Sequence, residues 1–102
     1  MQQNQEPKKE AGIQIQLDEA TAQGVYINLA LINHTETEFI LDFIYVQPQS
    51  PQGKVRSRVL TSPIHMKRLL GALSENMKKY EERFGEIKLA QDQPVQKIGF
   101  LQ

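Results

Sequence analysis

Basic side chains are concentrated in one stretch of this 102-residue chain. Between Phe43 and Ser74 there are five Lys or Arg residues and no Asp or Glu, although the whole chain has 12 of each charge and a formal net charge of zero. Such a bias is typical of a surface that binds phosphates or an acidic partner, because Lys and Arg neutralise anionic charge. The candidate anion-binding residues are Lys54, Arg56, Arg58, His65, Lys67 and Arg68, with Tyr45 as an aromatic surface.

The first three of these cations occupy every second position from 54 to 58, where they alternate with Val55 and Val59 along residues 54–61. A strand there would carry all three on its solvent-exposed face, because successive side chains of a strand point to opposite sides. Lys67 and Arg68 follow in the second turn of the next predicted helix, whose N-terminus adds free N–H donors and partial positive charge. Tyr45 and Tyr26 could stack on unpaired bases. We therefore expect one anion-binding surface, with single-stranded nucleic acid as a possible partner.

Acidic residues on the neighbouring predicted strand offer a structural alternative for two of the arginines. Arg56 and Arg58 could instead pair across strands with Glu36, Glu38 and Asp42. Asp42 lies among apolar residues, and a buried carboxylate needs a partner. We expect that partner to be an arginine from residues 54–61, and both readings of the arginines stay open at the level of sequence.

The residue types of common catalytic and metal sites are missing or unsuitably spaced. The absence of Cys excludes disulfides, thiolate nucleophiles and cysteine-based zinc sites. His34 and His65 do not have a metal-binding spacing, and His65 could serve the helix start instead. Glu38 and Asp42 would lie about 13 Å apart on a strand, beyond the roughly 5–9.5 Å of paired catalytic carboxylates. We predict a protein that is not an enzyme and that uses no metal or cofactor.

The composition indicates one small folded domain. The chain has a mass of 11.7 kDa and 39% hydrophobic residues, and no apolar run approaches the roughly 18–20 residues that span a bilayer. The first ten residues lack an apolar stretch, so we expect no secretory signal and a cytoplasmic location. The predicted organisation is a disordered arm over residues 1–11, a single domain over 12–87 and a flexible tail over 88–102.

Alternation of apolar and polar residues, interrupted by turn residues, predicts four strands before one helix. The polar stretch from Asn33 to Thr37 is typical of a hairpin, and Pro48, Pro51 and Gly53 indicate a loop. The expected fold is α+β, with a four-stranded antiparallel sheet followed by one long C-terminal helix. The predicted strands span residues 12–18, 24–33, 38–47 and 54–61.

The helix has clear start and stop signals. Ser62 can cap free backbone N–H groups, Pro63 suits the first helical position, and Gly85 can end the helix in a left-handed conformation. A helix between these residues would be roughly 33 Å long, which is enough to lie across the whole sheet. Its apolar residues recur at steps of three and four and form one stripe: Met66, Leu69, Leu70, Leu73, Met77, Tyr80 and Phe84.

The two middle strands are apolar on both faces, whereas a single helix can cover only one face. Residues 24–33 and 38–47 each have large apolar side chains at both odd and even positions. A strand of this kind should be covered on both sides. We therefore expect a twofold homodimer, either sheet on sheet or helix-exchanged. The alternative is that the N- or C-terminal segment folds back over the second face.

From about Gly24 to Gly85 the sequence resembles a family of small bacterial and archaeal proteins called domain of unknown function 3467. The resemblance implies the element order and a small standalone protein, and it supplies no catalytic residues. The matching motifs are Tyr26-Ile-Asn-Leu, Glu38-Phe-Ile-Leu-Asp-Phe43, Val55-Arg-Ser-Arg-Val59, Ser62-Pro63-x-His65-x-Lys67-Arg-Leu69 and Tyr80-Glu-Glu-x-Phe-Gly85.

The order of four strands and one helix also resembles that of the coactivator, Whirly and Pur-type domains, which bind single-stranded nucleic acid as obligate dimers. This likeness concerns topology alone. Our hypothesis is a dimeric, non-enzymatic binding module for single-stranded nucleic acid or another polyanion. The alternative is a protein-interaction or assembly module that docks a different chain through its apolar sheet face.

Overall fold

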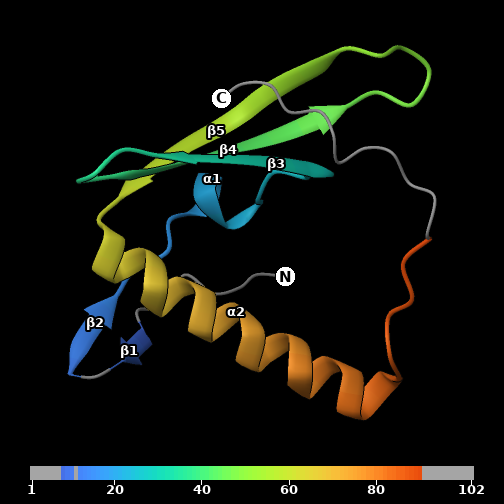
Figure 1. The fold of residues 1–102 in the computed structure, drawn as a ribbon. Coiled ribbons are helices and arrows are strands. Elements are labelled where there is room, and N and C mark those ends of the chain that lie inside the picture. Colours follow the sequence, from blue (N-terminus) through green and yellow to red (C-terminus); the bar gives the residue numbers. More distant parts are fainter. Residues whose placement is uncertain (1–7, 11, 91–102) are drawn as a thin grey trace.

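The computed structural model describes residues 8–10 and 12–90. Two antiparallel sheets are formed, one from β1 and β2 and one in the order β3-β4-β5, and a long helix follows the second sheet (Figure 1). The elements are β1 (Lys8–Glu10), β2 (Ile13–Ile15), α1 (Glu19–Ala22), β3 (Leu29–His34), β4 (Phe39–Val46), β5 (Gly53–Thr61) and α2 (Pro63–Phe84).

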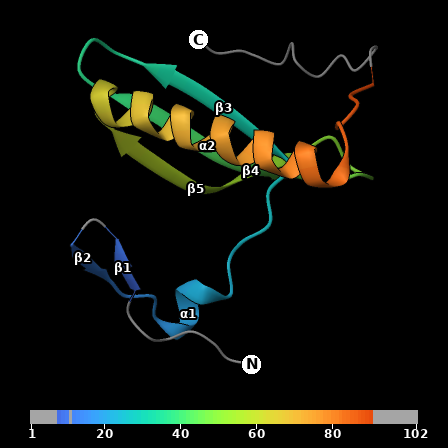
Figure 2. The same cartoon turned by 90° about the horizontal axis from the view of Figure 1, so that it is seen from below.

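The fold is α+β as predicted, but its main sheet has three strands and not four. The first predicted strand forms β2, which pairs with β1 in a hairpin (Lys8 opposite Ile15) and does not join β3, β4 or β5. Gly12, with a φ of 80°, supplies the left-handed backbone that this tight reversal requires. Figure 2 shows the hairpin and α1 standing apart from the main sheet. The topological likeness to four-stranded nucleic-acid-binding domains therefore does not hold.

Both predicted terminal segments are described only in part. Lys8–Glu10, from the expected disordered arm over residues 1–11, form β1. Residues 88–90 of the expected flexible tail belong to no helix or strand. The other residues of the arm and of the tail, 1–7, 11 and 91–102, lie outside the described part of the chain.

In the main sheet, β4 lies between β3 and β5 and pairs antiparallel with both. The turn between β3 and β4 is closed by Thr35, whose N–H donates to the Glu38 carbonyl at 2.9 Å and whose Oγ1 accepts from the Glu38 N–H at 3.1 Å. At the other end of β3, Asn28 continues the ladder with its side chain, because its amide both accepts from the Val46 N–H at 2.8 Å and donates to the Val46 carbonyl at 3.0 Å. These bonds fix the register of the sheet.

A bulge in β5 changes which side chains share a face. Phe43 is opposite Ser57, but its neighbour Ile44 is opposite Val55, so β5 has one extra residue at Arg56. Because side chains alternate along a strand, a one-residue insertion transfers everything beyond it to the other face. We predicted that Lys54, Arg56 and Arg58 share one face of the sheet. This prediction is wrong for Arg58, which follows the bulge.

Helix α2 begins and ends at the predicted residues. The Ser62 Oγ accepts from the His65 N–H at 3.2 Å, and Pro63 is the first helical residue. Gly85 ends the helix with a φ of 101°, and its N–H donates to the Glu81 carbonyl at 2.9 Å. Both caps satisfy backbone groups that a helix end would otherwise leave without partners.

The expected packing of α2 on the sheet is not observed in the single chain. Within the described residues α2 makes no extensive contact with any strand, and none of its residues is buried. Figure 1 shows the helix leaving the end of β5 and diverging from the sheet. Its outer apolar residues, here called the α2 stripe, are 37–64% exposed. The α2 stripe consists of Leu69, Leu70, Leu73, Met77, Tyr80 and Phe84.

The core of a single chain is consequently very small. Among the described residues, only Leu41 and Ile44 are buried hydrophobic residues, and Asp42 is the one buried charged residue. All three lie on β4, where the two flanking strands shield them. Apolar side chains on both faces of the sheet stay exposed, including Ile32 and Leu60.

Candidate functional site

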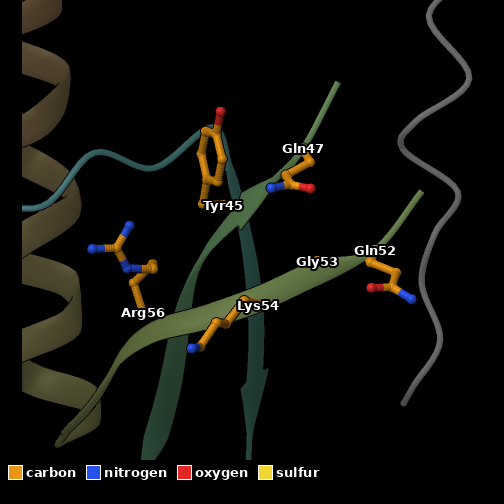
Figure 3. A pocket seen from close by; sticks show the side chains of 6 residues that line it. All are labelled: Tyr45, Gln47, Gln52, Gly53, Lys54 and Arg56. Carbon is orange, nitrogen blue, oxygen red and sulfur yellow. The ribbon is translucent and has the colours of Figure 1, made fainter. Parts of the chain in front are cut away.

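Two of the predicted cations meet in a cleft at the end of the sheet. Lys54 lies opposite Tyr45 in the register of β5 and β4, so their side chains share one face. Figure 3 shows Arg56 beside them, around the strand ends that flank the loop over residues 47–52. The cleft has a volume of about 410 Å³ and is lined by Tyr45, Gln47, Gln52, Gly53, Lys54 and Arg56. Its lining is thus aromatic, cationic and amide, without a carboxylate.

Arg58 does not belong to this cleft. Arg58 lies opposite Asp42, which is three residues from Tyr45 on β4. The side chain of Arg58 therefore lies on the opposite face of the sheet from Lys54 and Tyr45. Its Nε and Nη2 donate to the two carboxylate oxygens of Asp42 at 2.7 Å and 2.9 Å. This bidentate pair is the structural alternative that the sequence left open, and it is confirmed for Arg58.

The Asp42–Arg58 pair has the electrostatics of a stabilising contact. Asp42 is 8% exposed. The hydrogen bond from Arg58 lowers the pKa of Asp42 below its ordinary value, against the raising effect of burial, and the positive charge of Arg58 adds to the lowering. The same hydrogen bond raises the pKa of Arg58. The pair therefore keeps a carboxylate ionised inside an apolar sheet.

The remaining acidic candidates do not pair with the cleft. In the part of the chain that the structure describes, the Asp42–Arg58 contact is the one ion pair, so Arg56 has no carboxylate partner there. The Glu38 N–H takes part in the turn with Thr35, and Glu36 lies in the same turn.

The two helix cations lie at the far end of β5 from the cleft. Lys54 and Thr61 are seven steps apart along the strand, roughly 23 Å at 3.3 Å per residue, and Lys67 and Arg68 follow beyond Thr61. His65 helps to start the helix, because its Nδ1 lies 3.0 Å from the Ser62 Oγ. The single basic surface predicted from sequence is therefore divided into a cleft, an ion pair and a helix start.

Two residues that line the cleft, Gln47 and Gln52, carry no signal of their own in the sequence, whereas Tyr26 was already a predicted stacking surface. Gln47 and Gln52 contribute amides from either end of the loop, and they read as ordinary polar loop residues until the strands bring them together. Tyr26 contacts Tyr45 edge-on, with ring centroids 6.2 Å apart and an interplanar angle of 68°. Tyr26 lies before β3 and is 74% exposed, so it extends the aromatic surface beyond the cleft.

A second hollow lies near the same end of the sheet. Its volume is about 540 Å³, and it is lined by Asn28, Leu29, Val46 and residues 47–51. The lining is mainly apolar side chains of the sheet and the two prolines of the loop. It has no charged side chain, so it offers space but no recognition chemistry for an anion.

These features define a small α+β protein with a three-stranded main sheet, a separate two-stranded hairpin, a long capped amphipathic helix and a basic cleft. The chain belongs to the family described as Protein of unknown function (DUF3467), which matches residues 1–89. No curated protein and no solved structure shows significant similarity to the chain. None of the helices within the described residues is long and apolar enough to cross a membrane.

Proposed function

We propose that this protein is a non-enzymatic binding module that works as a homodimer, with α2 at the interface. The observation that carries the proposal is the α2 stripe, which is exposed from Leu69 to Phe84 and has no extensive contact with a strand of its own chain. Contiguous apolar patches of this extent are rare on soluble monomers and mark interaction sites. The occupant we assign to the stripe is α2 of a second copy.

The spacing of the stripe supports a helix as the occupant. Leu70, Leu73, Met77, Tyr80 and Phe84 follow one another at alternating steps of three and four residues. This 3.5-residue average is the pattern of a seam between two helices, in which side chains of one helix fill spaces on the other. A shallow hollow on α2 between Leu73, Met77 and Glu81 offers such a space.

The exposed area is sufficient for a stable dimer. With roughly 200 Å² for a fully exposed large apolar side chain, the exposed parts of the α2 stripe amount to about 600 Å² per copy. Two copies would bury about 1,200 Å² through the stripe alone, and stable interfaces bury about 1,200–2,000 Å² in total. Contacts with exposed sheet residues such as Ile32 would add to this area.

Charge also favours a second copy. The chain has a formal net charge of zero, so two copies do not repel each other overall. The stripe is bordered by Ser74, Asn76, Glu81 and Arg83, a mixture of neutral and oppositely charged side chains. A twofold arrangement therefore brings no large block of like charge together.

A core as small as that of the single chain makes the dimer important for stability. A domain of this size that buries only Leu41 and Ile44 among its described hydrophobic residues would be marginal by itself. The second copy would supply the missing burial, so folding and association should be coupled.

The second candidate is a protein-interaction module whose exposed sheet docks a different chain. Ile32 and Val59 on one face and Leu60 on the other favour it, because they stay exposed beside the short core. A well-folded monomer in solution would support this candidate, since its apolar faces would then await another partner.

Light scattering on the purified full chain separates the two candidates. The homodimer predicts a mass of twice the 11.7 kDa of one chain. Met77→Asp, which places a charge in the seam, should reduce the dimer fraction strongly. Lys79→Asp, on the opposite side of the same helix, is the matched control and should keep the dimer. A folded monomer for the unsubstituted chain would overturn the proposal.

A further inference from the structure

The bulge in β5 selects which cations face the cleft. Up to Arg56 the strand alternates regularly, so Lys54 and Arg56 both line the cleft with Tyr45. Beyond the bulge, Arg58 turns to the opposite face and its charge is matched by Asp42. Bulges commonly re-aim side chains next to functional sites. Lys54 and Arg56 thus both line the cleft, and no carboxylate among the described residues forms an ion pair with either of them.

An aromatic pair adjoins these cations. Tyr26 and Tyr45 meet edge to face, so one edge of the largely exposed Tyr26 ring rests against Tyr45 while its faces remain open to solvent. A largely exposed tyrosine next to cations is the combination that single-stranded nucleic-acid-binding surfaces use, because bases stack on the ring and phosphates follow the positive charge. The ring of Tyr26 has room for a base, since it is mostly in contact with solvent.

The amides complete the chemistry of the cleft. Gln47 and Gln52 line it from the two ends of the loop, and the Gln47 N–H donates to the Gln52 carbonyl at 3.4 Å, which holds the ends together. Each side-chain amide has both donors and an acceptor, so each can bind the edge of a base. A volume of about 410 Å³ lies in the range of pockets that hold small molecules of nucleotide size.

We propose that this cleft binds single-stranded nucleic acid. Lys54 and Arg56 contact backbone phosphate, Tyr26 stacks on a base, and the amides of Gln47 and Gln52 contact base edges. Unpaired strands are favoured over a duplex, because stacking on Tyr26 requires a base outside a helix. The inference deepens the binding module of the proposed function by naming its ligand, and a twofold dimer would present two such clefts.

The test is fluorescence anisotropy of the full chain with labelled 20-nucleotide oligo(dT), oligo(U) and a duplex of equal length. At about 50 mM salt the single strands should bind more tightly than the duplex, and affinity should fall on raising salt to about 200 mM, because phosphate contacts release counterions. The two single strands show whether DNA or RNA is preferred.

Variants separate stacking from charge. Tyr26→Ala should weaken single-strand binding about tenfold, within the range measured for one base stacked on an aromatic ring. Lys54→Gln with Arg56→Gln should weaken it further and reduce the salt dependence. Lys79→Gln, which removes a cation on α2 far from the cleft, is the control and should change nothing. Because Tyr26 is largely exposed, its substitution should leave the fold intact, and circular dichroism of the variant checks this.

Three outcomes would overturn the inference. They are no binding at about 50 mM salt, preference for the duplex, and equal competition by inorganic polyphosphate with no effect of Tyr26→Ala, which would leave a non-specific polyanion surface. Light scattering on the same samples keeps the two proposals separate. An intact dimer without binding refutes the cleft alone, whereas a monomer that binds refutes the dimer alone.

Discussion

Leu73 gives the sharpest quantitative test of the proposed dimer. It lies at the middle of the α2 stripe and is 58% exposed in the single chain. If α2 were free in solution, Leu73→Ala would change stability by less than about 0.5 kcal/mol, as exposed substitutions generally do. If the stripe is a dimer seam, the same substitution removes a buried side chain from each copy.

The expected effect follows from the exposed fraction of Leu73. Full burial of a leucine side chain contributes about 1.5–3 kcal/mol. Burying the 58% that is exposed should therefore contribute about 0.9–1.7 kcal/mol per copy, and thus as much as about 3 kcal/mol per dimer. A loss of about 3 kcal/mol corresponds to a dissociation constant roughly 150-fold higher.

Sedimentation equilibrium over a range of protein concentrations measures this dissociation constant. Lys79→Ala, on the polar side of α2, is the control and should leave the constant unchanged within a factor of about three. Equal dissociation constants for Leu73→Ala and the unsubstituted chain would contradict the proposed seam, because Leu73 would then lie outside any interface.

Three further predictions concern the single chain. The pKa of Asp42 is lowered by Arg58, so their pair should stabilise the fold above the ordinary carboxyl pKa and lose that effect as pH falls through the lowered value. In Arg58→Gln, the melting temperature should fall less steeply between neutral pH and about pH 2 than in the unsubstituted chain. If the pKa of Asp42 measured by NMR is the same in both chains, Arg58 does not lower it and the prediction is wrong. Gly71→Ala should raise the free energy of unfolding by about 0.5–1 kcal/mol, because a Cβ at this position meets open space. Chemical denaturation measures this free energy. A lower value for the variant would contradict the exposed placement of that helix turn. Gly53→Ala should lower the melting temperature, since its Cβ would lie 3.1 Å from the Cγ2 of the buried Ile44, and a gain would show that the sheet yields at this point.

The helix was fully predictable from the sequence, because its signals are local. Ser62, Pro63 and Gly85 act on the backbone groups nearest to them, and the apolar stripe is periodic over the whole segment. The predicted strands over residues 38–47 and 54–61 also agree closely with β4 and β5 for the same reason. Each depends on alternation within a single stretch of chain.

The distribution of the cations was not predictable, because it depends on pairing between strands. Nothing in the residues around Arg56 indicates a bulge, and only the register against Phe43 and Ile44 reveals it. One inserted residue then separates Arg58 from Lys54. The sequence alone indicated that an arginine of residues 54–61 pairs with Asp42. It could not show that this arginine is Arg58, because that depends on the register of β4 and β5.

The first predicted strand illustrates a different limit. Ile13 and Ile15 alternate correctly for a strand, and residues 13–15 do form one. Alternation does not identify a partner, however, and here the partner is the polar segment over Lys8–Glu10, which has no strand pattern of its own. The local sequence pattern therefore predicts a strand at residues 13–15, but it does not determine which other segment pairs with that strand.

The most direct test of the account is whether α2 of one copy contacts α2 of another. Mixing isotope-labelled and unlabelled full-length chains and recording isotope-filtered NOEs reports only contacts between copies. We expect intermolecular NOEs among the methyl groups of Leu70, Leu73 and Met77. If no intermolecular NOEs appear and an unfiltered spectrum shows α2 NOEs only to the sheet, such as to Ile32 or Val59, the helix covers its own subunit and the proposed dimer seam does not exist.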